Sequence, residues 1–112
     1  MNLHYNKHHT GYVEKLNKLI AESATSPQKK VELAQAIKFN GGGHFNHEFF
    51  WESLAPKGKG GKPSETLLKM IKDQFGSLDK LQKSFSEWST GTQGSGWGWL
   101  AYNKNSGKLE YR

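Results

Sequence analysis

Three consecutive glycines, Gly41 to Gly43, stand in the middle of a stretch whose apolar residues otherwise recur at helical spacing. The periodic segments lie on either side, from Val31 to Phe39 and from Phe45 to Leu54. Three glycines inside a helix cost roughly 1 kcal/mol each relative to alanine. Either the helix breaks at this point, or close packing against another backbone compensates for that cost. A phosphate-binding loop is disfavoured, because the Gly-Lys-Ser/Thr ending and the preceding strand are both missing.

Two amphipathic helices are predicted in the first half of the chain. Apolar residues recur every three or four positions from Tyr12 to Ala24, which is typical of a helix with one buried face. Ser26 is a good N-cap and Pro27 suits the first turn of a helix. We therefore expect a second helix to begin at this point and to carry the periodic segments that flank the glycines.

The stretch from Ala55 to Lys62 (APKGKGGK) is polar and rich in glycine and lysine, as expected of a flexible linker. It predicts a first domain over residues 1–54 and a second over residues 63–112. The fold class expected is α+β, with long N-terminal helices followed by the start of a small α/β domain with an antiparallel sheet.

In the second part, two shorter helices and a pair of strands are predicted. The third helix opens at residues 63–65 and closes at Gly76, and Ser77 caps the fourth. Small and large residues alternate over residues 95–102, which favours a strand. A turn follows, and residues 108–111 form the returning strand of the antiparallel pair.

Composition excludes several classes of protein. The chain has 112 residues and no cysteine, which rules out disulfide scaffolds, thiolate zinc sites and cysteine nucleophiles. No apolar run approaches the ~18 residues of a membrane span. Sixteen Lys and Arg against ten Asp and Glu give a net charge of +6, but the lysines are scattered and no nucleic-acid-binding module is recognisable.

All five histidines lie in the first 47 residues, in two groups. His4 and His8 are four apart, with Tyr12 four residues further on, and His44 and His47 are three apart. Such pairs can converge on Zn, Cu, Fe, Mn or Ni. Histidines on amphipathic helices are more often hydrogen-bonded surface or boundary residues, so spacing alone leaves both interpretations open.

Three motifs in order carry a resemblance: residues 3–12 (LHYNKHHTGY), 38–51 (KFNGGGHFNHEFFW) and 93–100 (QGSGWGWL). Together they resemble the manganese/iron superoxide dismutase family. The resemblance runs over nearly the whole chain, and it implies that the first two helices form a hairpin. It also implies the disproportionation of superoxide to O2 and H2O2 at a redox-active ion.

The resemblance assigns roles to individual residues. His4 and His47 match metal ligands on two facing helices. His8 and Tyr12 match residues of the substrate funnel and proton relay, and Gln93 matches the glutamine that hydrogen-bonds metal-bound solvent. These three are the implied catalytic residues.

Further positions match the surroundings of the metal. Trp51 and Trp97 match its aromatic shell, whereas His9 and His44 match histidines that are not ligands. Iron-type members carry the solvent-binding glutamine where this chain has Gly43, so the resemblance favours manganese, with iron as the alternative.

The family's other two ligands, an aspartate and a histidine, match nothing in this sequence. Asp73 and Asp79 are possible carboxylate ligands, but both fall near the junction of the third and fourth helices. We therefore expect these residues to form the central part of a dismutase and to be inactive as residues 1–112 alone.

The alternative function is a catalytically inactive subunit with the dismutase fold in a larger assembly. The resemblance further implies a homo-oligomer or docking into an assembly, and a mitochondrial or, alternatively, cytoplasmic location.

Overall fold

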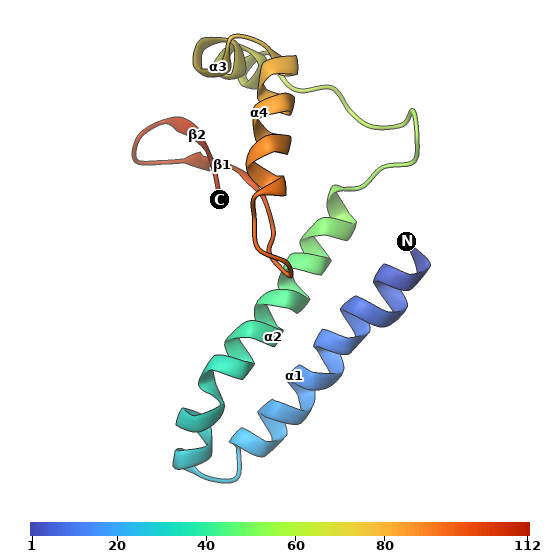
Figure 1. Cartoon of the computed structure of the whole chain (residues 1–112), viewed down its shortest axis with the longest axis vertical. Helices are drawn as coiled ribbons and strands as arrows, with labels where there is room; N and C mark the ends of the chain where they lie inside the picture. Colours follow the sequence, from blue (N-terminus) through green and yellow to red (C-terminus); the bar gives the residue numbers. More distant parts are fainter. The chain divides into compact units, whose positions relative to one another are not determined.

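Ser26 and Pro27 separate two long helices, so the first part of the chain folds as a helical hairpin. In the computed structural model, which describes residues 1–112, α1 spans Thr10–Ser23 and α2 spans Pro27–Ser53 (Figure 1). The hydroxyl of Ser26 accepts a hydrogen bond from the Lys29 amide at 3.1 Å, which satisfies one of the unpaired amides at the start of α2. The predicted cap and helix start are confirmed.

The segment before α1 is helical too, but it is wound differently. Residues His4–His9 form a π-helix, η1, which continues directly into α1. In a π-helix each amide bonds to the carbonyl five residues earlier, and such turns are rare and often found at functional sites.

The glycine triplet does not break α2. Gly43 is buried, and a Cβ added to it would lie 2.5 Å from Cε1 and 2.7 Å from Cγ of Tyr12 on α1. A Cβ on Gly42 would meet nothing within 4 Å. Close packing is therefore the correct alternative, although an aromatic ring of the facing helix, and not its backbone, occupies the space.

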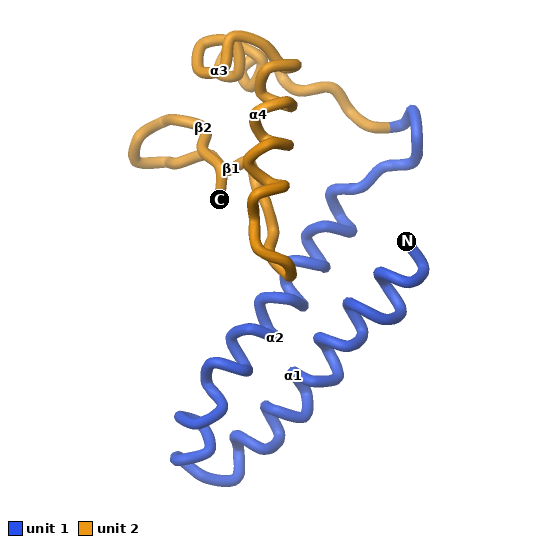
Figure 2. Tube along the Cα trace, viewed as in Figure 1, with its two compact units in different colours: residues 1–59 blue, residues 60–112 orange.

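The chain divides into two compact units, Met1–Lys59 and Gly60–Arg112 (Figure 2). In the second unit α3 spans Glu65–Phe75 and α4 spans Leu78–Thr90, followed by strands β1 (Leu100–Asn103) and β2 (Lys108–Tyr111). The two strands pair antiparallel. The α+β fold class is thus confirmed, with a helical first unit and a mixed second unit.

Local residue chemistry explains the bounds of α3 and α4. Gly76 has φ 87°, which glycine adopts without a steric penalty and which ends α3. Ser77 then caps α4 by accepting a hydrogen bond from the Lys80 amide at 3.1 Å. Ile71, Leu81 and Leu109 form the buried core of this unit, with one residue contributed by each helix and one by β2.

The predicted strand over residues 95–102 is wrong over residues 95–99, because β1 begins only at Leu100. The Gly96 amide donates to the Gln93 carbonyl at 2.9 Å, and Ser95 has φ 64°, so residues 93–96 form a tight turn. Gly98 lies against α4, where a Cβ would come within 2.7 Å of the Ser89 hydroxyl. Alternating small and large residues here reflect a turn and a close approach, and not a strand.

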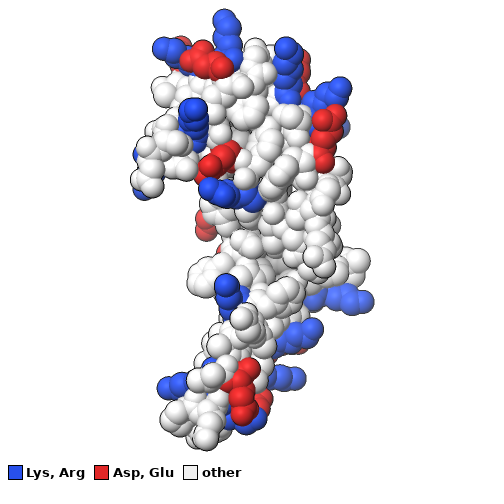
Figure 3. Space-filling model, turned by 60° about the vertical axis from the view of Figure 1, so that its left-hand side comes forward, with Lys and Arg blue, Asp and Glu red and all other residues white.

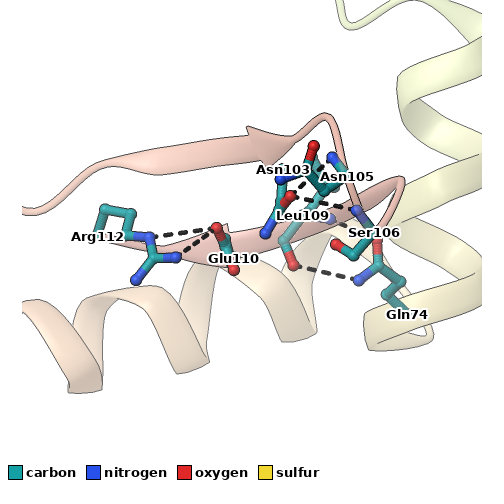
Figure 4. Close-up of polar contacts among 7 residues, drawn as sticks. All are labelled: Gln74, Asn103, Asn105, Ser106, Leu109, Glu110 and Arg112. Atoms are coloured by element: carbon teal, nitrogen blue, oxygen red, sulfur yellow. Dashed lines mark hydrogen bonds and ion pairs between the residues drawn. The ribbon is translucent and has the colours of Figure 1, made fainter.

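The side chain of Gln74 on α3 pairs with the outer edge of β2 (Figure 4). Its Oε1 accepts from the Leu109 amide at 2.9 Å, and its Nε2 donates to the Leu109 carbonyl at 3.2 Å. The side-chain amide thus makes both of the bonds that a neighbouring strand would make to this residue.

We expect Gln74→Leu to loosen the strand pair without unfolding the helices. Two hydrogen bonds at about 0.5–1.5 kcal/mol each are lost, so exchange of the Leu109 amide hydrogen should accelerate by about tenfold or more. Hydrogen exchange followed by NMR measures this rate, with Lys72→Leu on the exposed face of α3 as the control. Unchanged protection of the Leu109 amide in Gln74→Leu would contradict the prediction.

No helix in residues 1–112 combines the length and the apolar character that a membrane span requires.

Candidate metal centre

His47 is the buried residue around which the candidate centre is built, with only 3% of its surface exposed. Its Nδ1 lies 2.6 Å from the carbonyl oxygen of Gly43, one turn earlier on α2. Because a carbonyl can only accept, Nδ1 carries the proton, and the Nε2 lone pair of the neutral ring is available to a metal. Metal-binding histidines commonly hold their second ring nitrogen in this way.

His4, on the facing helical segment, brings a second imidazole nitrogen to the same point. Its Nε2 lies 2.9 Å from Nε2 of His47. Two nitrogens that are each about 2.1 Å from one ion and at a right angle to each other are about 3.0 Å apart. The pair therefore fits adjacent positions around one ion, and two neutral imidazoles suit a divalent transition metal.

The π-helix explains how two residues of one segment can contact the same ring of α2. The ring centroids of His4 and His9 lie 4.9 Å and 5.2 Å from that of His47. In a regular α-helix, residues five apart point about 140° away from each other. The wider turn over His4–His9 brings both side chains to the face that meets α2.

Other residues predicted for the site lie around these two histidines. The Tyr12 ring is 5.4 Å from the His47 ring, and the Trp51 ring is 5.5 Å from the His4 ring. His8 contacts His4 at 5.4 Å between centroids and is otherwise exposed. The hairpin therefore brings five of the predicted residues together.

Two histidines that the resemblance leaves outside the ligand set also lie at this centre. Nε2 of His9 and Nδ1 of His44 are 2.9 Å apart, and Trp51 donates from Nε1 to Nδ1 of His9 at 2.9 Å. Sequence reasoning missed the contact between His9 and His44, since it joins two different helices and leaves no periodic signal in either one. The adjacent pair His8-His9 is the only feature of the sequence that could have pointed to a role for His9 at the centre.

Gln93 and Trp97 belong to the second unit. Gln93 is exposed in the turn before β1, and the ring of Trp97 stacks on Trp99 at 5.4 Å and 3°. Their roles at the centre stay predictions. Asp73 and Asp79 lie on α3 and α4, and no group of three or more His, Cys, Asp or Glu is arranged to hold a metal ion.

Burial and neighbouring histidines favour the neutral form of two histidines in the first helical segment. Burial lowers the pKa of His4 below its ordinary 6.5, and His47, His8 and the N-terminal amine lower it further. Burial likewise lowers the pKa of His9, with His47 and His44 adding to the effect and Glu48 opposing it. Neutral imidazoles at pH 7 are the form that binds metals.

The lowered pKa values predict an acid-sensitive hairpin in the metal-free protein. Unfolded histidines titrate near about 6.5, so the unfolded chain binds more protons than the folded one as the pH falls through that value. The stabilising contribution is complete above about pH 7 and is lost as the pH falls from there toward the lower pKa values of the folded state. Thermal unfolding followed by circular dichroism between pH 8 and pH 5 measures the change in Tm. The double variant His4→Asn/His9→Asn should flatten this dependence, and an unaltered slope in that variant would refute the assignment.

Charge is not collected at one place on the face that Figure 3 shows. Basic side chains are distributed across the face shown in Figure 3, with acidic side chains among them. The excess is nevertheless positive, at +6.

The hairpin, the small mixed unit and the paired imidazoles define an α+β protein with a candidate metal centre between two helices. Two family domains match it: "Iron/manganese superoxide dismutases, alpha-hairpin domain" over residues 1–55, and "Iron/manganese superoxide dismutases, C-terminal domain" over residues 63–112. The chain belongs to the iron/manganese superoxide dismutase family. A relative named as mitochondrial manganese superoxide dismutase of Petromyzon marinus is 49% identical over 114 residues, which cover 97% of this chain and 78% of the relative.

Proposed function

We propose that this chain is a manganese superoxide dismutase subunit, in which His4 and His47 bind the ion through Nε2. The observation that carries the proposal is the 2.9 Å separation of these two nitrogens, which come from facing helices. Membership of the family and the manganese relative support it. The bound ion would supply one-electron redox chemistry: one superoxide is oxidised to O2, and a second is reduced and takes two protons to become H2O2.

Position 43 supports manganese over iron. The resemblance places the solvent-binding glutamine of iron-type members at this position, but here Tyr12 occupies the space next to Gly43. A side chain at position 43 would collide with that ring before it could approach the ion. Iron remains the alternative ion.

The residues around the two ligands have separate tasks in this proposal. The phenol of Tyr12 and the imidazole of His8 lie next to the ligand rings and would pass protons to the reduced product. The Trp51 indole lies nearly perpendicular to the His4 ring, at 5.5 Å between centroids, and would limit access of water. The roles of Gln93 as a further proton-relay residue and of Trp97 as part of the aromatic shell rest on the resemblance alone.

Assay of the manganese-loaded protein for superoxide disproportionation tests the proposal. Because the substrate is an anion and the chain carries +6, the rate should fall as salt is raised from about 10 to about 100 mM, where the screening length shortens from about 30 to about 10 Å. Sucrose at equal osmolarity is the control. A loaded protein that does not accelerate disproportionation would favour the alternative, an inactive subunit with the same fold. A rate that is independent of salt would remove only the steering by charge.

Two further properties follow from the same relative and family. We propose a mitochondrial location, as in the name of the relative from Petromyzon marinus, with the cytoplasm as the alternative. We also propose that the protein is a homo-oligomer. Each subunit would contain one domain over residues 1–54 and a second over residues 63–112. Fractionation and light scattering of the natural protein test these statements. Residues 1–112 as a separate polypeptide should bind manganese weakly and lack activity, since they supply only two imidazole ligands, so the assay above uses the natural protein.

A further inference from the structure

Trp51 fixes the protonation of His9 across the hairpin. The indole N–H can only donate, and it points to Nδ1 of His9 at 2.9 Å. Nδ1 of His9 must therefore be free of a proton, and the neutral ring carries its proton on Nε2. The lowered pKa of His9 agrees with this, because an imidazolium would have no lone pair for the indole.

The direction of the next hydrogen bonds follows from the first. Nε2 of His9 donates to Nδ1 of His44 at 2.9 Å, so His44 keeps its own proton on Nε2. That nitrogen lies 3.6 Å from Oε2 of Glu48. The result is an ordered series, Trp51–His9–His44–Glu48, which we name the imidazole chain. His9 is its only member from the first helical segment, and the other three lie on α2.

The imidazole chain holds the His9 ring flat against the proposed ligand His47. The two rings are within 8° of parallel, with centroids 5.2 Å apart. His47 is held along one edge by the carbonyl of Gly43, at 2.6 Å. At its other edge, Nε2 of His47 lies 2.9 Å from Nε2 of His4. Contacts at these two nitrogens do not by themselves fix rotation of the ring about the line that joins them, and a parallel neighbour limits this rotation.

We propose that His9 is a positioning residue for the metal ligand His47. Through the imidazole chain it keeps the His47 ring in the plane in which Nε2 points to Nε2 of His4. This inference rests on the proposed function, since it requires that His4 and His47 hold the ion. It predicts a slower release of metal than the two ligands would achieve alone, because outer partners of ligands typically contribute about 10–100-fold in metal affinity.

Release of Mn(II) from the loaded full-length protein to an excess of chelator measures this contribution. His9→Leu keeps an apolar side chain in the space but makes neither hydrogen bond, and it should release manganese about tenfold faster or more. His9→Gln should remain within about threefold of the wild type. The glutamine carbonyl can accept from Trp51, and its amide can donate to His44. Equal rates for His9→Leu and the wild type would overturn the inference.

A variant with a purely structural defect separates positioning from general stability. Leu16→Ala removes a half-buried contact between α1 and α2 beside Gly41, away from the histidines. It should lower Tm without changing the rate of metal release. If Leu16→Ala speeds release as much as His9→Leu does, or if His9→Gln is as fast as His9→Leu, the positioning role is refuted.

The protonation pattern can be measured without any variant or metal. In ¹⁵N NMR spectra of the metal-free wild type, His9 and His44 should carry the proton on Nε2, and His47 should carry it on Nδ1. A proton on Nδ1 of His9 would overturn the imidazole chain. If the wild-type protein holds no manganese, the proposed function is refuted. If the wild type holds manganese and His9→Leu retains it equally well, this inference alone is refuted.

Discussion

His47→Ala is expected to hold almost no manganese and to lose dismutase activity, because it removes the buried one of the two proposed ligands. The Nδ1 proton of His47 is bound by the Gly43 carbonyl, and Nε2 faces His4 at 2.9 Å. The loss should exceed the about 10–100-fold effect of removing a group that only supports a ligand. Metal content by mass spectrometry and activity on the same preparation measure it.

Matched variants distinguish ligands from neighbouring histidines. His4→Ala should behave as His47→Ala does, since each supplies one nitrogen of the pair. His9→Ala should reach full stoichiometry when manganese is in excess, even if it releases the ion faster. If His9→Ala empties the site while His4→Ala fills normally, the assignment of ligands along η1 is wrong.

Gly43→Ala is expected to destabilise the hairpin by about 2 kcal/mol or more, a large effect for one methyl group. The new Cβ would lie 2.5 Å from Cε1 of Tyr12, far inside normal contact distance, so the ring or the helices must move apart. Such movement would also shift the Gly43 carbonyl that holds His47. Urea unfolding followed by the helical circular dichroism signal measures the free energy of unfolding.

The neighbouring glycine provides the control with the opposite sign. A Cβ at Gly42 meets nothing within 4 Å, so Gly42→Ala should stabilise α2 by about 1 kcal/mol through helix propensity alone. In a Tyr12→Ala background the cost of Gly43→Ala should largely disappear. Equal effects of the two alanines in the wild-type background would contradict the packing argument.

Much of the fold could be predicted because helix ends carry local chemical signals. The caps at Ser26 and Ser77 and the left-handed turn at Gly76 act within a few residues, so their pattern is visible in the sequence. The start of β1 could not be predicted in this way. The glycines before it serve a turn and a contact with α4, and alternation looks the same whether a strand or such packing produces it.

The candidate centre could be predicted only in part, and mainly by resemblance. Spacing placed His4 with His8 and His44 with His47, whereas the structure pairs His4 with His47 and His9 with His44. The reason is that both pairs join different helices, and contacts between helices leave no periodic signal within either one. The π-helix over residues 4–9 could not be predicted either. It differs from an α-helix in bonding each amide to the carbonyl five residues earlier instead of four, and no particular residue type marks this difference.

The π-helical turn has a consequence for insertions and deletions in this segment. Relative to an α-helix, a π-turn accommodates one extra residue while the helix on both sides continues. Residues four apart in an α-helix are offset by only about 40°, so removal of one residue between His4 and His9 would leave both rings facing α2. The segment between His4 and α1 would become one residue shorter, and residues 1–3 would move together with His4. A one-residue deletion at Asn6 is therefore a conservative change in this hairpin, whereas the same deletion within α1 would rotate the whole of η1 by about 100° away from His47.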